Sequence, residues 1–142
     1  MNDGPILLIE DNPDDRELTL RALARFRADL SVIALKDCSE VSELLEQRGR
    51  FAPAAFSKPA SLILLDLKMP QVDGISLLRR LRLNESTQLV PVIVLSSSRE
   101  RRDIRAAYQA GANGYVPKPV EFDQFIQQIR FICQYWLDCN QH

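Results

Sequence analysis

The stretch LILLDLKMP, residues 62–70, decides the fold class and raises the question of function. Its four apolar residues, Leu62 to Leu65, are typical of a strand covered on both faces, as in a parallel sheet. The run ends on Asp66, and a buried carboxylate without a partner is costly. Asp66 must therefore be paired, bound to a metal ion, or placed at a strand end that opens to water.

Similar apolar runs lie before and after this stretch, and helical patterns separate them. We predict strands at 6–9, 32–35, 62–65, 92–95 and, less clearly marked, 114–116, and helices at about 13–27, 39–49, 73–84, 99–110 and 121–138. Five strand–helix units in series imply right-handed crossovers. The pattern predicts one doubly wound α/β domain, with a five-stranded parallel sheet and five helices.

The composition fits a single ordinary domain. The chain has 142 residues, of which 46% are hydrophobic and 26% charged, with a net charge of −1. This balance gives no field that would hold nucleic acid, and no apolar run could span a bilayer, so we expect neither partner. Three cysteines without a metal-binding spacing indicate reduced thiols in the cytoplasm. The only histidine is His142, which argues against histidine-based catalysis within the chain.

One connector between the predicted elements is long. GRFAPAAFSKPAS, residues 49–61, contains two prolines and several small residues, so we predict a surface loop. It is either a tolerated insertion or a loop that binds a partner.

Polar side chains follow four of the five predicted strands, at the edge where open α/β sheets bind ligands. They are Glu10 and Asp11 after the first strand, Asp66 after the third, Ser96 after the fourth and Lys118 after the fifth. Three converging carboxylates would repel one another unless a cation such as Mg²⁺ lay among them. The hydroxyl and the ammonium could then hold phosphoryl oxygens, with Asp66 as a nucleophile that forms an aspartyl-phosphate.

Each of these features alone has an ordinary explanation as a helix cap, a strand-end hydroxyl or a surface lysine, but the ordered set favours phosphoryl transfer. A phosphohydrolase with an aspartate nucleophile would need a second acid two residues after Asp66, where the chain has Lys68, and a substrate cap. A flavin-binding domain would need a phosphate-cradling loop after the first strand, where IEDNPDD is acidic.

At these residues the sequence resembles the response-regulator receiver domains of two-component signalling, over about residues 5–138. IEDNPDD resembles the acidic pair of that family, DLKMPQVDG its acceptor loop, PVIVLSSS its hydroxyl strand and AGANGYVPKP its lysine–proline end. The resemblance implies a flavodoxin-like strand order of 2-1-3-4-5 and a signalling protein rather than an enzyme. It also implies one receiver domain over residues 1–142 with no output domain.

The resemblance also implies a role for each matching residue. Asp66 would be the phospho-acceptor, Lys118 the phosphate partner, Ser96 the switch hydroxyl and Tyr115 the switch aromatic. Mg²⁺ would be bound by Asp11 and Asp66, by Glu10 through water and by the backbone carbonyl of Lys68, and Pro119 would follow a cis peptide bond. Pro117 departs from the common pattern and is tolerable only if the fifth strand is a sheet edge.

The long connector and the segment RFICQYWLDC, residues 130–139, resemble the single-domain regulators that partner bacterial phytochromes. This subgroup implies a histidine kinase as phosphodonor, with a phytochrome as the candidate, and an unidentified downstream protein. A receiver-like binding module that works without phosphorylation is the alternative, and the intact set of acids, hydroxyl and lysine argues against it.

The predicted last helix carries an apolar stripe that reads as core, at positions 122, 125, 126, 129, 132, 133, 136 and 137. Phe131 and Tyr135 lie outside this stripe, so we predict that they form the face of a homodimer. Four arginines at 99, 101, 102 and 105 mark the start of the fourth helix. They are either a solvated face or a contact for an acidic partner.

Overall fold

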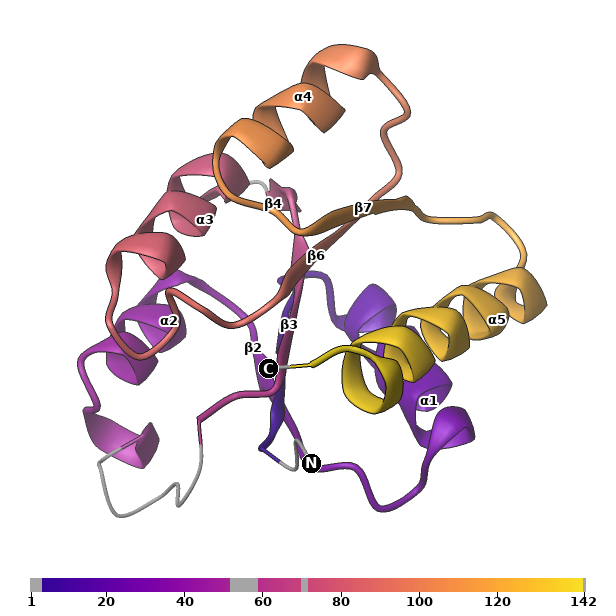
Figure 1. Cartoon of the computed structure of the whole chain (residues 1–142), viewed down its shortest axis with the longest axis horizontal. Helices are drawn as coiled ribbons and strands as arrows, with labels where there is room; N and C mark the ends of the chain where they lie inside the picture. Colours follow the sequence, from indigo (N-terminus) through magenta and orange to yellow (C-terminus); the bar gives the residue numbers. More distant parts are fainter. Residues whose placement is uncertain (1–3, 52–58, 70–71, 142) are drawn as a thin grey trace.

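The computed structural model describes residues 4–51, 59–69 and 72–141, and its elements form three layers with a parallel sheet in the middle (Figure 1). The strands of the sheet are β1 (Ile6–Ile9), β2 (Val32–Leu35), β3 (Leu62–Asp66), β6 (Val92–Ser96) and β7 (Gly114–Pro117). They run in the order β2-β1-β3-β6-β7, and every neighbouring pair is parallel. The predicted fold class and strand order are therefore confirmed.

The helices are α1 (Pro13–Phe26), α2 (Cys38–Leu45), α3 (Gly74–Leu83), α4 (Arg101–Gln109) and α5 (Phe122–Cys133), and the last continues as a π-helical segment, η3 (Gln134–Cys139). Side chains at two helix starts explain where those helices begin. Asn12 accepts the N–H groups of Asp14 and Asp15 at 2.9 and 3.0 Å, and Asp37 accepts that of Glu40 at 2.9 Å. No helix among the described residues is long and apolar enough to cross a membrane.

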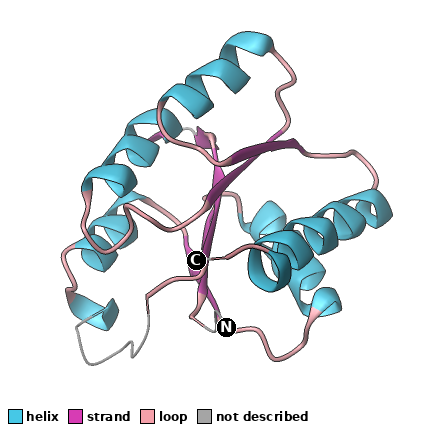
Figure 2. Ribbon diagram, viewed as in Figure 1, coloured by secondary structure: helices cyan, strands magenta, loops and turns pink. Residues whose placement is uncertain are grey.

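Two apolar cores fill the spaces on either side of the sheet, because α2, α3 and α4 cover one face and α1 and α5 the other (Figures 1 and 2). Along β1, Leu7 and Ile9 face the first group of helices, whereas Ile6 and Leu8 face the second. All five residues of β3 are buried. Burial on both faces explains why the strands are continuous apolar runs.

The apolar stripe predicted in the last helix lies in the second core. Phe125, Ile129, Ile132 and Cys133 are buried, and Phe122, Ile126, Trp136 and Leu137 pack against them. Phe131 and Tyr135 leave 59% and 53% of their surface exposed. Two aromatic side chains on this helix therefore remain open to solvent in the single chain.

Two predicted details near the connector differ from the structure. α2 ends at Leu45, and a 3₁₀ turn at Gly49–Phe51 follows it. Phe51 is only 2% exposed and lies in the first core, because an aromatic ring next to a helix end can still bury its apolar area. The surface-loop prediction is therefore wrong at this residue, and residues 52–58 lie outside the described part of the chain.

A short hairpin that the sequence did not predict follows β3. β4 (Lys68–Met69) pairs in antiparallel fashion with β5 (Val72–Asp73) before α3 begins. Gly74 is required at that start, because a Cβ there would lie 2.6 Å from the Cα of Leu67. α3 therefore packs tightly against the residue that follows Asp66.

The cis peptide bond expected before Pro119 is a wrong prediction, because no peptide bond in the described ranges is cis. The trans form is favoured by about 0.5–1 kcal/mol even before proline. With the trans bond, the N–H of Lys118 donates to the carbonyl of Ser96 at 2.7 Å. Pro117 does lie in an edge strand, as its missing N–H requires.

Arg82 joins α3 to the loops at the opposite end of the sheet from the predicted site. Its guanidinium donates to the carbonyls of Gly111 at 2.8 Å and Val90 at 2.6 Å, and to the side chain of Asn113. Asn113 in turn accepts the N–H of Val92 at 2.8 Å, at the first residue of β6. The Arg82 side chain thus fixes both the start of β6 and the turn before β7 by hydrogen bonds.

We expect Arg82→Met to lower the free energy of unfolding by about 2–4 kcal/mol, because it leaves partly buried carbonyls without a donor. Urea denaturation followed by circular dichroism would measure the change. Arg80→Met is the matched control on the same helix, since Arg80 is exposed and bonds only the Ser42 hydroxyl among the contacts described. Equal effects of the two substitutions would contradict this role for Arg82.

Candidate functional site

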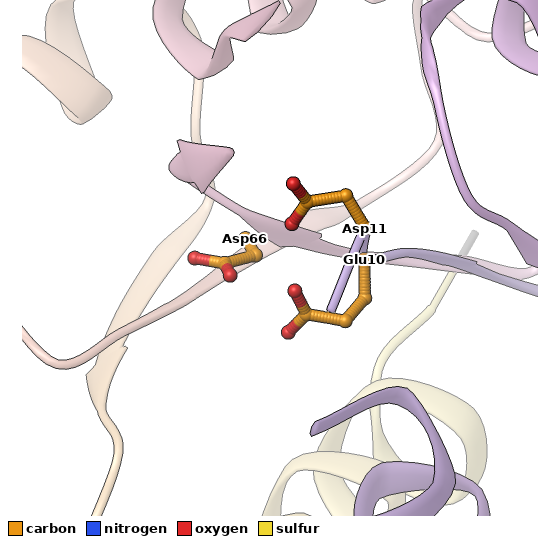
Figure 3. A group of neighbouring side chains, drawn as sticks. All are labelled: Glu10, Asp11 and Asp66. Carbon is orange, nitrogen blue, oxygen red and sulfur yellow. The ribbon is translucent and has the colours of Figure 1, made fainter. Parts of the chain in front are cut away.

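Three carboxylates meet at the carboxyl ends of β1 and β3. Glu10 and Asp11 follow β1, and Asp66 is the last residue of β3. One oxygen from each lies within 4.8 Å of the others, and the side chains of Glu10 and Asp11 extend toward Asp66 (Figure 3). Glu10 is 2% exposed and Asp66 8%. The structure therefore brings together the three acids that the sequence places after neighbouring strands.

Lys118 supplies the positive charge of this cluster. Its Nζ lies 2.9 Å from Glu10 Oε1, 3.5 Å from Asp66 Oδ2 and 3.8 Å from Asp15 Oδ2. The lysine directly follows β7, whose register with β6 is fixed by the pairing of Ser96 with Pro117. Lys118, at the end of β7, thus lies with its ammonium beside acids at the ends of β1 and β3.

The cluster changes the pKa of two of its members. Burial, together with the nearby Asp66, raises the pKa of Glu10 from 4.5 to about 7. Burial alone would lower the pKa of Lys118, but the carboxylates of Glu10, Asp66 and Asp15 outweigh it and raise the pKa. Lys118 therefore stays charged, whereas Glu10 changes its charge near neutral pH.

The donor set suits a hard divalent cation. The acids offer oxygen ligands only, and one ammonium does not balance their combined charge when all are ionised. Mg²⁺ and Mn²⁺ bind such carboxylate sites, and Mg²⁺ usually keeps several waters. Asp11, Asp66 and Glu10 are the side chains that would hold the ion. Lys68 begins β4 two residues after Asp66, and the use of its carbonyl as a ligand stays a prediction.

Two residues that the sequence reasoning did not single out support the acidic loop. Arg16 donates through Nη1 to the carbonyls of Glu10 and Asp11, at 3.0 and 3.4 Å. Asp15 adds a third carboxylate near Lys118, after Glu10 and Asp66. Both lie in the first turn of α1, where an acidic residue reads as ordinary helix capping. The sequence signal that could have found them is their spacing, because Asp15 and Arg16 follow Asp11 by only four and five residues.

The predicted switch residues lie on the two neighbouring strands. Ser96 ends β6, is fully buried, and accepts the N–H of Ser98 on Oγ at 3.1 Å. Tyr115 lies in β7, is half-buried, and donates its hydroxyl to the carbonyl of Ser98 at 2.9 Å. Both side chains thus bond Ser98, a residue that the sequence analysis assigned no role.

Comparison with known proteins identifies, along most of the chain, the same family that the sequence motifs resemble. The model of the response regulator receiver domain matches residues 6–130. The probable methanogenesis regulatory protein FilR2 of Methanothrix harundinacea is 33% identical over 139 residues, which cover 96% of this chain and 85% of FilR2. The response regulator Rcp1 of Synechocystis is 31% identical over 133 residues, which cover 94% of this chain and 88% of Rcp1.

Solved structures agree with the sequence relatives. The phosphorylated cyanobacterial phytochrome response regulator RcpA superposes with a TM-score of 0.87 at 31% identity, over 99% of this chain and 98% of RcpA. The Mn²⁺-bound form of Rcp1 superposes with a TM-score of 0.83 at 30% identity, over 97% of both chains. With its parallel sheet, its acidic cluster and these matches, the chain belongs to the family of response regulator receiver domains.

Proposed function

We propose that this chain is a stand-alone response regulator that accepts a phosphoryl group from a histidine kinase onto Asp66. The observation that carries the proposal is the position of Asp66, at the mouth of a central strand with the ammonium of Lys118 3.5 Å away. Glu10 and Asp11 complete an acidic cluster with it. A nucleophilic carboxylate, a fixed positive charge and a cation site are what phosphoryl transfer requires, because its catalysis is mostly positioning and charge neutralisation.

The transfer would proceed by in-line attack. A carboxylate oxygen of Asp66 forms the new P–O bond as the P–N bond of the donor's phosphohistidine breaks, and the electron pair of that bond stays on the imidazole nitrogen. Lys118 then balances charge on the phosphoryl oxygens, for which it must loosen its 2.9 Å contact with Glu10. A bound Mg²⁺ would neutralise further negative charge on the carboxylate and phosphoryl oxygens.

The phosphoryl group would act as a switch between two packings of the same domain. Ser96 would donate its hydroxyl to a phosphoryl group on Asp66, a role supported by its position directly after Leu95, the residue that pairs with Asp66. Tyr115 follows this movement from the next strand. The balance between the two packings would set which surface the domain presents to an unidentified downstream protein.

The relatives suggest the type of kinase and the compartment. RcpA is a phytochrome response regulator, and its likeness extends over almost the whole chain. We therefore propose a bacteriophytochrome as the phosphodonor. The three cysteines are free thiols in the structure, which fits the reducing cytoplasm in which such a kinase would meet its regulator.

We also propose a homodimer through α5. Exposed Phe131 and Tyr135 continue a stripe of the glutamines 124, 127 and 128 at helical spacing, and the stripe contains no charged residue. A second copy of the same helix would meet no repulsion between like charges there. The aromatic side chains supply the apolar area that such a contact buries.

The central proposal predicts a covalent product. With Mg²⁺ and acetyl phosphate, the wild-type chain should gain the mass of one phosphoryl group, and Asp66→Asn should gain none, because an amide is not a nucleophile in this reaction. Intact-mass spectrometry measures both. Asp138→Asn, which removes an acid far along the chain on η3, is the control and should behave as wild type. No gain in the wild type, or an equal gain in Asp66→Asn, would refute the acceptor role.

The metal proposal predicts stabilisation of the folded chain. Mg²⁺ at tenfold its dissociation constant should raise stability by about 1.4 kcal/mol and Tm by about 3–6 °C, which differential scanning fluorimetry would detect. At one fixed Mg²⁺ concentration, the gain should be smaller at pH 6 than at pH 8, because the ion binds more weakly at pH 6. Glu10, with a pKa of about 7, holds a proton at the lower pH that the ion must displace.

Asp11→Asn should remove most of this Mg²⁺-dependent gain, because the ion loses a charged ligand. Asp29→Asn removes an exposed acid between α1 and β2 and should leave the gain intact. A gain that survives Asp11→Asn unchanged would place the ion elsewhere.

The dimer proposal predicts that Phe131→Asp produces a monomer. Light scattering at tens of micromolar should give twice the chain mass for the wild type and one chain mass for the variant, because a charge replaces the apolar contact. Leu83→Asp is the control, since Leu83 on α3 is 84% exposed and outside the stripe. A wild-type monomer, or an intact dimer of Phe131→Asp, contradicts the proposed face.

A further inference from the structure

Ser98 is a junction of hydrogen bonds directly after β6. It is 7% exposed, and each of its polar groups has a partner. Its N–H donates to Ser96 Oγ at 3.1 Å, and its carbonyl accepts the hydroxyl of Tyr115 at 2.9 Å. Its Oγ accepts the N–H of Glu100 at 3.2 Å and donates to the carboxylate of Asp103. One small residue therefore contacts both predicted switch side chains and the first turn of α4.

The bond to Ser96 sets the orientation of the switch hydroxyl. A serine hydroxyl has one proton to donate and two lone pairs to accept. Because the N–H of Ser98 occupies one lone pair of Ser96 Oγ, the oxygen is held in place and its own proton can still be donated to a phosphoryl oxygen. Ser98 therefore positions Ser96 without competing for its proton.

The other side of the junction holds α4. The N-cap residue Glu100 makes no side-chain capping bond, and Ala107 is the one fully buried residue of this helix within the part of the chain that the structure describes. The first turn of α4 is instead fixed from outside the helix, through the two bonds that Ser98 Oγ makes with Glu100 and Asp103. A helix with so little buried surface depends on such bonds for its position.

We infer that Ser98 and Asp103 form a positioning pair that transmits movement of Ser96 and Tyr115 to the first turn of α4. The inference rests on the proposed function, because phosphorylation of Asp66 is what would move the two switch residues. A displaced Ser96 or Tyr115 pulls on the N–H or the carbonyl of Ser98, and Ser98 Oγ carries the displacement to Asp103. The exposed arginines 99, 101, 102 and 105, which lie at or near the start of α4, would move with it.

Hydrogen exchange measured by mass spectrometry tests the pair, with peptides that cover residues 99–108. In the wild type, phosphorylation with acetyl phosphate and Mg²⁺ should change the exchange rate of these peptides. In Ser98→Ala, exchange should be about fivefold to tenfold faster before phosphorylation, because the first turn of α4 loses its hydrogen bonds to Ser98 Oγ. Intact mass should still show full phosphorylation of Asp66 in this variant.

The decisive quantity is the difference in exchange between the phosphorylated and unphosphorylated forms. It should fall by about twofold or more in Ser98→Ala and Asp103→Asn, and persist in Ser98→Thr, which keeps the hydroxyl. Ser97→Ala is the matched control and should behave as wild type, because Ser97 is the exposed serine directly before Ser98. If Ser98 were only a helix cap, Ser98→Ala would accelerate exchange equally in both forms, and this result would overturn the inference.

A second measurement separates failure of the pair from failure of phosphorylation. In the unphosphorylated chain, Tyr115→Phe removes the hydroxyl that bonds the Ser98 carbonyl. The effects of Tyr115→Phe and Ser98→Ala on exchange of residues 99–108 should be non-additive, because both act through one junction. Additive effects would overturn the inference, whereas a wild type that gains no phosphoryl mass would overturn the proposed function alone.

Discussion

The contact between one ammonium and a group of acids is the constraint on which the rest of this structure depends. Lys118 meets Glu10 and Asp66 where three different strands end, so the register of the whole sheet must be correct for the charges to meet. Acids at this separation repel one another strongly in a partly buried place. The rigid apolar strands behind them, buried on both faces, prevent the cluster from spreading apart. The packing of the strands thus offsets the repulsion between the acids and keeps them close together.

Much of the fold could be predicted from the sequence because double-sided burial leaves a simple signal. The strands from Ile6, Val32, Leu62, Val92 and Gly114 begin where the apolar runs predict, and helix ends differ by a few residues. The order of polar groups after the strands also predicted which side chains would meet. Features that depend on tertiary neighbours were missed. Phe51 lies in a proline-rich connector, and Ser98, Asp103 and Arg16 become significant only once their hydrogen-bond partners are known.

The helices that cover the sheet bury different amounts of surface. On one face α1 and α5 bury a continuous core, and Arg27 at the end of α1 bonds both carboxylate oxygens of Asp138 on η3. Burial there raises the pKa of Cys133 to about 12, so its thiol stays neutral and apolar in character. On the other face α2 and α3 also bury apolar residues, but α4 buries only Ala107 among its described residues. A change at the acidic cluster therefore meets less resistance toward α4 than toward α1 and α5.

Pro117 has a consequence for how the molecule can associate. In a strand, successive N–H groups point to opposite sides, and the N–H of Lys118 points inward to Ser96. The donor that Pro117 lacks would therefore have faced outward, along the open border of β7. An incoming strand from another molecule would find the ladder interrupted there, which disfavours growth of the sheet from chain to chain. The exposed border of β7 thus resists the strand-to-strand association by which sheets aggregate.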